Sequence, residues 1–163
     1  MSGSPGPVVG VLSPFVGGDY YGALIAGVTG AVADLGGRVV AIQTLDPGSH
    51  SADLCGVPDF RQPVGWDHLT AFVVVAGAVP GENVRALQRA GRPVVLMSHG
   101  FPGVECPTVV PDNRSGVREA VEHLIVEHGH ERIAFAGNLT NDDVQERYAG
   151  YLEGLLARGI APD

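Results

Sequence analysis

The chain has 163 residues, of which 45% are hydrophobic and 17% are charged, and this composition favours a folded chain over a disordered one. Its formal net charge of −8 argues against a nucleic-acid-binding surface, because phosphate contacts need clustered Lys and Arg. No run of about 18 apolar residues is present, so we expect no membrane-spanning segment.

The N-terminus and the cysteines bear on the cellular compartment. Residues 1–7 lack the positive charge and the apolar stretch of a signal peptide, and we expect them to form a disordered tail. The chain has only two cysteines, Cys55 and Cys106, which argues against a disulfide framework. We therefore expect a cytoplasmic protein with reduced, structural thiols.

Short β-branched runs alternate with helical patterns, which is typical of βαβ units around a parallel sheet. The strands expected in the first two thirds of the chain are 8–12, 38–43, 71–75, 93–97 and 108–110. The expected helices are 21–35 and 82–90, both ended by glycine. The stretch 44–70 is rich in Pro and Gly and has no clear period, and we expect its crossover helix within 51–66.

The clearest helical pattern in the chain covers 114–128. Its apolar residues recur at the helical spacing i, i+3, i+4, i+7 and i+8, from Val117 to Ile125. Asp112 or Asn113 is expected to cap this helix, and Gly129 to end it. A strand at 132–136 and a helix at 144–158 are expected to follow.

Three motifs follow one another in this last third of the chain: Asp112-Asn113-Arg114-Ser115-Gly116, then Gly129 to Phe135, then Arg147-Tyr148-Ala149-Gly150-Tyr151. In this order and spacing they resemble the effector-binding domain of the LacI/GalR family of sugar-responsive regulators, over nearly the whole chain. The resemblance implies an α/β fold of the periplasmic-binding-protein type, with a Rossmann-like lobe at 8–108 and part of a second, similar lobe at 109–163. The complete fold is longer, so we expect an incomplete domain.

Ligands of open parallel sheets bind beyond the carboxyl ends of the strands. In the first lobe this rule selects six candidate ligand-binding residues: Phe15, Tyr20, Tyr21, Ser98, His99 and Phe101. The aromatic side chains near the first helix suit a sugar or a base, although packing of that helix would also explain one of the tyrosines. For His99, a hydrogen bond within its loop is the alternative to a ligand contact.

Two further candidates lie in the second lobe. Arg147 matches the arginine with which the family contacts its ligand, and a guanidinium fork suits paired hydroxyls or a carboxylate. A solvated helix arginine is the alternative. Asp112 is expected first as a helix cap and as a brace between the lobes, and direct ligand contact by Asp112 is a second possibility.

Other chemistries find less support in the sequence. His123, His128 and His130 are separated by five and two residues, which places them on different faces of a helix, and no Cys or carboxylate completes a cage. Gly17, Gly18 and the glycines near them fit neither the dinucleotide nor the phosphate-loop pattern. We expect no metal, no cofactor and no catalysis, and a nucleotide-using enzyme is the weaker alternative.

The resemblance implies a non-catalytic sensor of a small polar ligand, a sugar or a related metabolite, in a transcriptional or signalling regulator. Repressors of the family carry a helix-turn-helix before the first strand, whereas seven residues precede Val8 here. The runs 41–44, 66–68 and 111–119 resemble the subset fused to a diguanylate cyclase or kinase output, and a repressor trimmed of its headpiece is the alternative. We expect a homodimer, with no nucleic-acid contact by this segment and no membrane contact.

Overall fold

The computed structural model describes residues 6–44 and 66–162, which form two compact units, Met1–Val110 (unit 1) and Pro111–Asp163 (unit 2). Cys55 and nearly all of the segment expected to hold the crossover helix lie outside the described residues. The description resumes at a short 3₁₀ helix, η2, Trp66–His68. No helix in the described ranges is long and apolar enough to cross a membrane.

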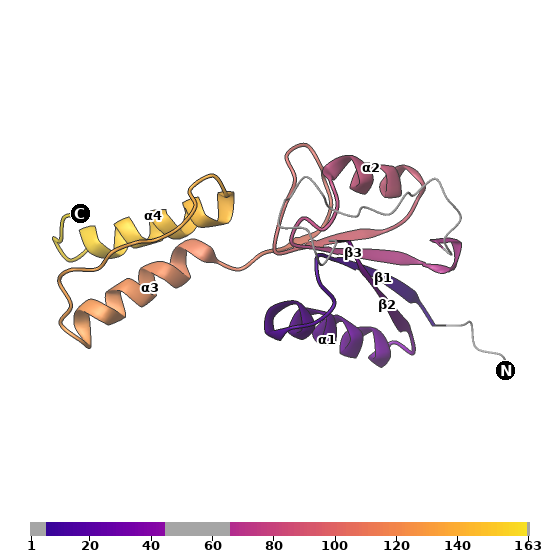
Figure 1. The fold of residues 1–163 in the computed structure, drawn as a ribbon, viewed down its shortest axis with the longest axis horizontal. Coiled ribbons are helices and arrows are strands. Elements are labelled where there is room, and N and C mark those ends of the chain that lie inside the picture. Colours follow the sequence, from indigo (N-terminus) through magenta and orange to yellow (C-terminus); the bar gives the residue numbers. More distant parts are fainter. Residues whose placement is uncertain (1–5, 45–65, 163) are drawn as a thin grey trace. The chain divides into compact units, whose positions relative to one another are not determined.

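Unit 1 is built on a parallel five-stranded sheet with the order β2-β1-β3-β4-β5 (Figure 1). Its strands are β1 Val8–Ser13, β2 Arg38–Gln43, β3 Ala71–Val75, β4 Val94–Met97 and β5 Thr108–Val109. Helices α1, Asp19–Asp34, and α2, Gly81–Arg89, lie on opposite faces of this sheet in Figure 1. The expected strands and helices of this part are confirmed, with boundaries that differ by two residues or fewer.

The core of unit 1 lies mainly between the sheet and α2. Ten residues make up its buried cluster: Leu12, Leu69, Phe72, Val74, Ala78, Val79, Val84, Leu87, Val94 and Leu96. Helix α1 buries only Val32 among its residues, although its sequence is largely apolar. The two faces of the sheet are therefore covered unequally, and α2 makes the larger contribution to the core.

The strand order places a topological switch point at β1. The chain leaves β1 through α1 to reach β2 on one side, and β3 lies on the other side of β1. In open parallel sheets the crevice for a ligand forms at the carboxyl ends of the two strands where the order reverses. In unit 1 those ends are Ser13 in β1 and Val75 in β3.

Unit 2 consists of two packed helices, α3 Asn113–Val126 and α4 Asp142–Leu156, with the connecting chain laid across them (Figure 1). Its buried cluster is small and contains Val121, Tyr151 and Leu155. The helices approach closely at Gly150, where a Cβ atom would overlap the carbonyl oxygen of Arg114. Only glycine fits there, because any side chain would push the two helices apart.

The strand expected at 132–136 is wrong: the described residues of unit 2 contain no strand. Ile133 and Phe135 pack against the cluster of α3 and α4, so the alternation of apolar residues that suggested a strand is real. A parallel strand also needs a neighbour that completes its ladder of hydrogen bonds. The Ile133 carbonyl instead accepts a hydrogen bond from the Tyr151 hydroxyl, at 2.8 Å.

Candidate ligand-binding site

The turn after β1 is held by hydrogen bonds around Ser13. Its side chain is fully buried, and its hydroxyl donates to the carbonyl oxygen of Phe15, at 2.7 Å. The carbonyl oxygen of Ser13 accepts from the backbone N–H of Thr44, at 3.0 Å, at the end of β2. Ser13 therefore has a structural role, because its bond fixes the backbone of Phe15, whose side chain is 41% exposed.

Three aromatic side chains gather at this end of the sheet. The ring of Tyr21 lies 5.6 Å from that of Phe15 and 5.1 Å from that of Tyr20, measured between centroids. Tyr20 is 55% exposed, whereas Tyr21 is half-buried. Tyr21 therefore packs against its neighbours, and Tyr20 is the tyrosine more open to a ligand. Partial burial raises the pKa of the Tyr21 hydroxyl, and Tyr20 adds to this shift, so the hydroxyl remains a hydrogen-bond donor.

The end of β4 contributes polar groups to the same region. The Tyr20 hydroxyl donates to the Ser98 Oγ, at 2.9 Å, and this bond joins residues 78 positions apart. Ser98 has a φ of 66°, in the left-handed region that a serine rarely adopts. His99 and Phe101 form an edge-to-face pair, with centroids 4.8 Å apart. Unit 1 therefore brings Phe15, Tyr20, Tyr21 and Ser98 into one connected group.

A second strained residue, which the sequence did not single out, lies at the end of the neighbouring strand β3. Ala76 has a φ of 48°, and its N–H still donates to the Met97 carbonyl oxygen of β4, at 2.8 Å. Strained residues of this kind cost about 1–3 kcal/mol each and cluster at ligand sites. Neither the pair Ala76-Gly77 nor the pair Ser98-His99 indicates a positive φ at its first residue, so these two strained residues could not be predicted from the sequence.

In unit 2, Arg147 is held by two acceptors. Its Nε donates to the Asn113 Oδ1, at 2.8 Å, and its Nη2 lies 3.3 Å from the Asp143 Oδ2. Asn113 is buried, with 8% of its surface exposed, and its Nδ2 donates to the Glu146 Oε2, at 3.4 Å. Arg147 is therefore not simply a solvated helix arginine, although 44% of its side chain remains exposed.

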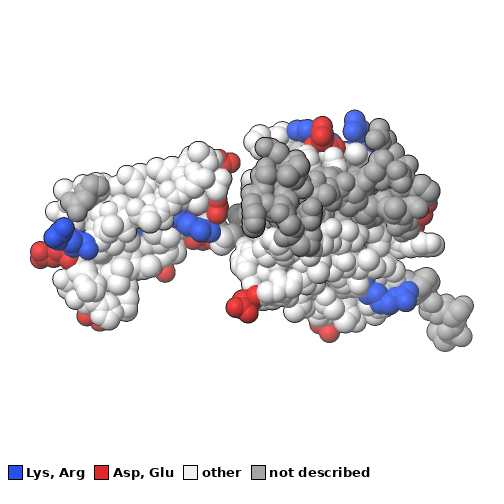
Figure 2. All heavy atoms as spheres, viewed as in Figure 1, with Lys and Arg blue, Asp and Glu red and all other residues white. Residues whose placement is uncertain are grey.

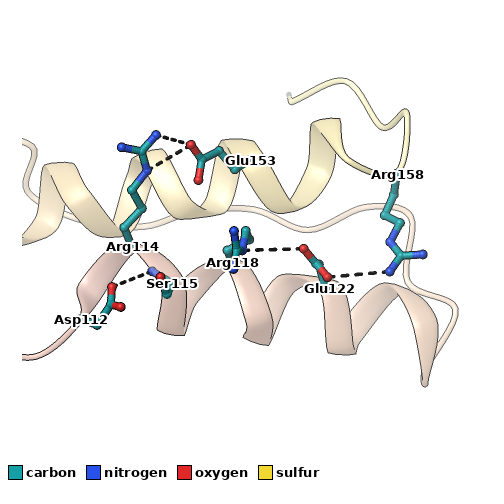
Figure 3. Close-up of polar contacts among 7 residues, drawn as sticks. All are labelled: Asp112, Arg114, Ser115, Arg118, Glu122, Glu153 and Arg158. Atoms are coloured by element: carbon teal, nitrogen blue, oxygen red, sulfur yellow. Dashed lines mark hydrogen bonds and ion pairs between the residues drawn. The ribbon is translucent and has the colours of Figure 1, made fainter.

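Asp112 caps α3, as the sequence predicted. Its Oδ1 accepts from the backbone N–H of Ser115, at 3.0 Å, and Figure 3 shows this contact at the start of the helix. The bond to that backbone N–H lowers the pKa of the Asp112 carboxyl. The cap accounts for the carboxylate by itself, and contact between Asp112 and a ligand stays a prediction.

Ion pairs tie α3 to α4 beside the cap (Figure 3). Arg114 donates through its Nε to the Glu153 Oε1, at 3.0 Å, and forms a second hydrogen bond to the same oxygen through its Nη2. This bond lowers the pKa of the Glu153 carboxyl and raises that of the guanidinium. Glu122 lies between two further arginines, Arg118 at 3.8 Å and Arg158 at 3.7 Å.

The basic side chains, which are all arginines, do not gather into one surface on the face that Figure 2 shows but are scattered among uncharged residues. Across the described ranges, no group of three or more His, Cys, Asp or Glu side chains is arranged to hold a metal ion. The candidate site residues thus offer aromatic faces, hydroxyl groups, the imidazole of His99, the carboxylate of Asp112 and the guanidinium of Arg147.

Comparison with known proteins relates the chain to transcription regulators. No family model matches it. It is 34% identical over 92 residues to the HTH-type transcriptional regulator GalR of Escherichia coli K12, which is 56% of this chain and 26% of that protein. It is 26% identical over 155 residues to the catabolite control protein A of Streptococcus mutans, which is 93% of this chain and 44% of that protein. The chain thus spans less than half the length of these relatives.

Solved structures show the same fold. A LacI family transcriptional regulator of Enterococcus faecium with bound ribose matches 94% of this chain and 54% of its own, with a TM-score of 0.71 and 20% identity. The transcriptional regulator CelR in complex with cellobiose matches 98% of this chain and 50% of its own, with a TM-score of 0.68 and 26% identity. The chain therefore shows homology to LacI/GalR-type regulators and has the parallel-sheet α/β fold of their periplasmic-binding-protein-like domains.

Proposed function

We propose that this chain is the ligand-sensing part of a LacI/GalR-type transcription regulator and that it catalyses no reaction. The observation that carries the proposal is the group of residues at the carboxyl ends of β1 and β4. In this group the rings of Phe15 and Tyr20 are exposed, and the Tyr20 hydroxyl is bonded to Ser98. Homology to GalR and to catabolite control protein A supports a regulator. Units 1 and 2 would then correspond to the first lobe and to part of the second lobe of the fold.

The proposed ligand is a sugar. Aromatic rings such as those of Phe15 and Tyr20 can stack on the apolar face of a pyranose, while hydroxyl groups and an imidazole match its hydroxyls. The cellobiose complex of CelR, which has the same fold, supports this ligand class. We also propose that His99, Phe101, Asp112 and Arg147 contact the ligand, and the exposed part of the Arg147 guanidinium suits paired hydroxyls.

A ligand switches a sensor of this kind by binding one of the sensor's two conformations more tightly than the other. Moving a population from 1:99 to 99:1 requires a difference of about 5.5 kcal/mol between the two affinities. Several hydrogen bonds that each contribute about 0.5–1.5 kcal/mol, together with ring stacking, supply that much. We propose that the full protein is a cytoplasmic homodimer whose DNA-binding part reads this change. A cyclase or kinase output is the alternative, and the relatives favour the regulator.

The proposal is tested by thermal denaturation of the 163-residue chain with a panel of sugars, nucleosides and dinucleotides. We expect at least one sugar to raise the melting temperature, and Ser98→Ala to abolish this shift. The matched control is Thr29→Ala, which removes a hydroxyl bonded only to its own helix, at the Ile25 carbonyl oxygen. Mass analysis of the recovered ligand decides the catalytic question, because a chemically altered ligand would overturn the sensor proposal.

A further inference from the structure

Two histidines at the end of α3 lie against each other. The Nε2 atoms of His123 and His128 are 3.2 Å apart, and the ring centroids are 5.0 Å apart with the planes at 77°. A third ring, that of His130, stacks on His128 with centroids 6.0 Å apart. All three residues are exposed, so this histidine group is open to solvent.

The sequence predicted that these histidines lie on different faces of a helix, and the end of α3 explains why two of them meet. In a continuous helix, an offset of five residues would turn His128 away from His123. Helix α3 ends at Val126, and Gly129 adopts a φ of 67°, where its N–H donates to the Ile125 carbonyl oxygen. His128 precedes the chain reversal at Gly129, and its ring reaches that of His123 from the end of the last turn.

The distance between the two nitrogens matches that of a bidentate metal site. Zn–N bonds of about 2.0–2.1 Å at the tetrahedral angle place two ligand nitrogens about 3.3 Å apart. The 3.2 Å between His123 Nε2 and His128 Nε2 therefore needs almost no change to accept a metal. Without a metal, the two Nε2 atoms lie within hydrogen-bonding distance of each other, so the rings already hold the spacing that a metal needs.

The electrostatic surroundings favour a cation. The C-terminal end of a helix carries the negative end of its dipole, and the pair lies there. Glu119 and Glu127 stand four residues before and after His123, and both are exposed. Glu122, by contrast, is already engaged by Arg118 and Arg158. Imidazole nitrogens select Zn²⁺, Ni²⁺ or Cu²⁺ over Mg²⁺ and Ca²⁺, which prefer oxygen ligands.

We propose that His123 and His128 form a two-histidine site for a divalent transition metal, with water or a neighbouring carboxylate in the remaining positions. The site is separate from the proposed sugar-binding group and does not depend on it. A bound metal joins the last turn of α3 to the segment that leads into Ile133. Because the metal binds the folded unit, it stabilises unit 2 by mass action.

The experiment is a titration of the metal-free 163-residue chain with Zn²⁺ and Ni²⁺, followed by calorimetry and by NMR of the histidine side chains. We expect the signals of His123 and His128 to shift. His123→Gln and His128→Gln should each weaken binding by at least the about tenfold that the loss of an outer-shell partner costs a metal site. His68→Gln, which alters another exposed histidine, is the matched control and should bind as the unsubstituted chain does.

Equal affinity in the unsubstituted chain and in both variants would overturn the proposal, as would loss of binding in His68→Gln. A measurement without substitutions protects the test against variants that fail to fold. Cu²⁺ bound to the unsubstituted chain should give an electron paramagnetic resonance spectrum with superhyperfine splitting from two imidazole nitrogens. Splitting from a single nitrogen contradicts a shared site. Binding should also weaken in acid, because a protonated imidazole cannot coordinate a metal.

Discussion

Units 1 and 2 are held together in different ways. Unit 1 has five hydrogen-bonded strands and a buried cluster of ten residues, whereas the described part of unit 2 has two helices around a cluster of three. In unit 1 the candidate residues lie in the first turn of α1 and in the turns after β1 and β4, which are held by buried Ser13 and strained at Ser98. In unit 2, Arg147 is placed by a helix surface and by its bond to Asn113. Candidate sites in the two units therefore depend on different kinds of contact.

The largest effect is expected in the core of unit 1. Phe72 is almost fully buried in β3, and Phe72→Ala should lower the free energy of unfolding by about 3–5 kcal/mol, because it removes apolar contacts and leaves a cavity. Urea denaturation followed by circular dichroism measures the loss. The control is Leu35→Ala at a residue that is 73% exposed, where the change should stay within about 0.5 kcal/mol. Similar losses in the two variants would contradict the assignment of the core.

The second prediction concerns unit 2, where a larger side chain at Gly150 should disturb the close packing of α3 and α4. Gly150→Val should lower the free energy of unfolding by about 1–3 kcal/mol or more, because the obstacle is the backbone of Arg114 and not a flexible side chain. The matched control is Gly116→Ala on α3, where a Cβ meets nothing within 4 Å. That change should stabilise by about 0.4–1 kcal/mol. If both variants are equally stable, α3 and α4 do not pack as described.

A substitution at Arg147 should have a small effect on the stability of unit 2 and a large effect on ligand binding. Arg147→Ala leaves the side-chain Oδ1 of buried Asn113 without its bond to the guanidinium, which should cost about 1 kcal/mol of stability. We expect the same variant to lose the sugar-induced rise in melting temperature, measured by differential scanning fluorimetry. A variant that melts several degrees lower and still responds fully to sugar would make Arg147 a structural residue only.

The smallest effect is expected from acid. The folded pKa values of Asp112 and Glu153 are lowered, first by the hydrogen bonds from Ser115 and Arg114 respectively. Their stabilisation is therefore complete above the ordinary carboxyl pKa of about 4 and is lost as the pH falls through the lower folded values. Both groups are exposed, so solvent screening keeps the effect small. NMR of the carboxyl carbons against pH measures the shifts.

Asp112→Asn is the control for this acid effect, because an amide oxygen still caps a helix but does not titrate. Stability of α3 in this variant should depend less on pH than in the unsubstituted chain. An unchanged pH dependence would show that the cap carboxylate does not contribute to it.

Much of the fold was readable from local patterns. Buried parallel strands are continuous apolar runs, so β1 and β3 could be predicted from their residues alone. The cap by Asp112 and the helix end at Gly129 depend on neighbouring residues only, and both were predicted. The candidate residues of unit 1 were predicted on the ground that the ends of parallel strands share one edge of the sheet, and their contact with a ligand stays a prediction.

The features that the sequence missed all depend on residues far apart or on backbone geometry without a residue signature. Residues 132–136 alternate like a strand, yet a strand exists only when another pairs with it. The bond between Tyr20 and Ser98 and the left-handed turn at Ser98 arise from strand order. The meeting of His123 and His128 depends on side-chain conformation at the end of α3, which a helical wheel does not represent.

The sequence by itself determined the alternation of strands and helices, the helix ends and the residue types available for a ligand. These follow from the period of apolar residues and from capping, which act over a few positions along the chain. Only the tertiary structure decided the strand order, the burial of Asn113 beneath Arg147 and the bond between Tyr20 and Ser98. The physical reason is that hydrogen bonding and burial between distant segments depend on packing, which no local pattern encodes.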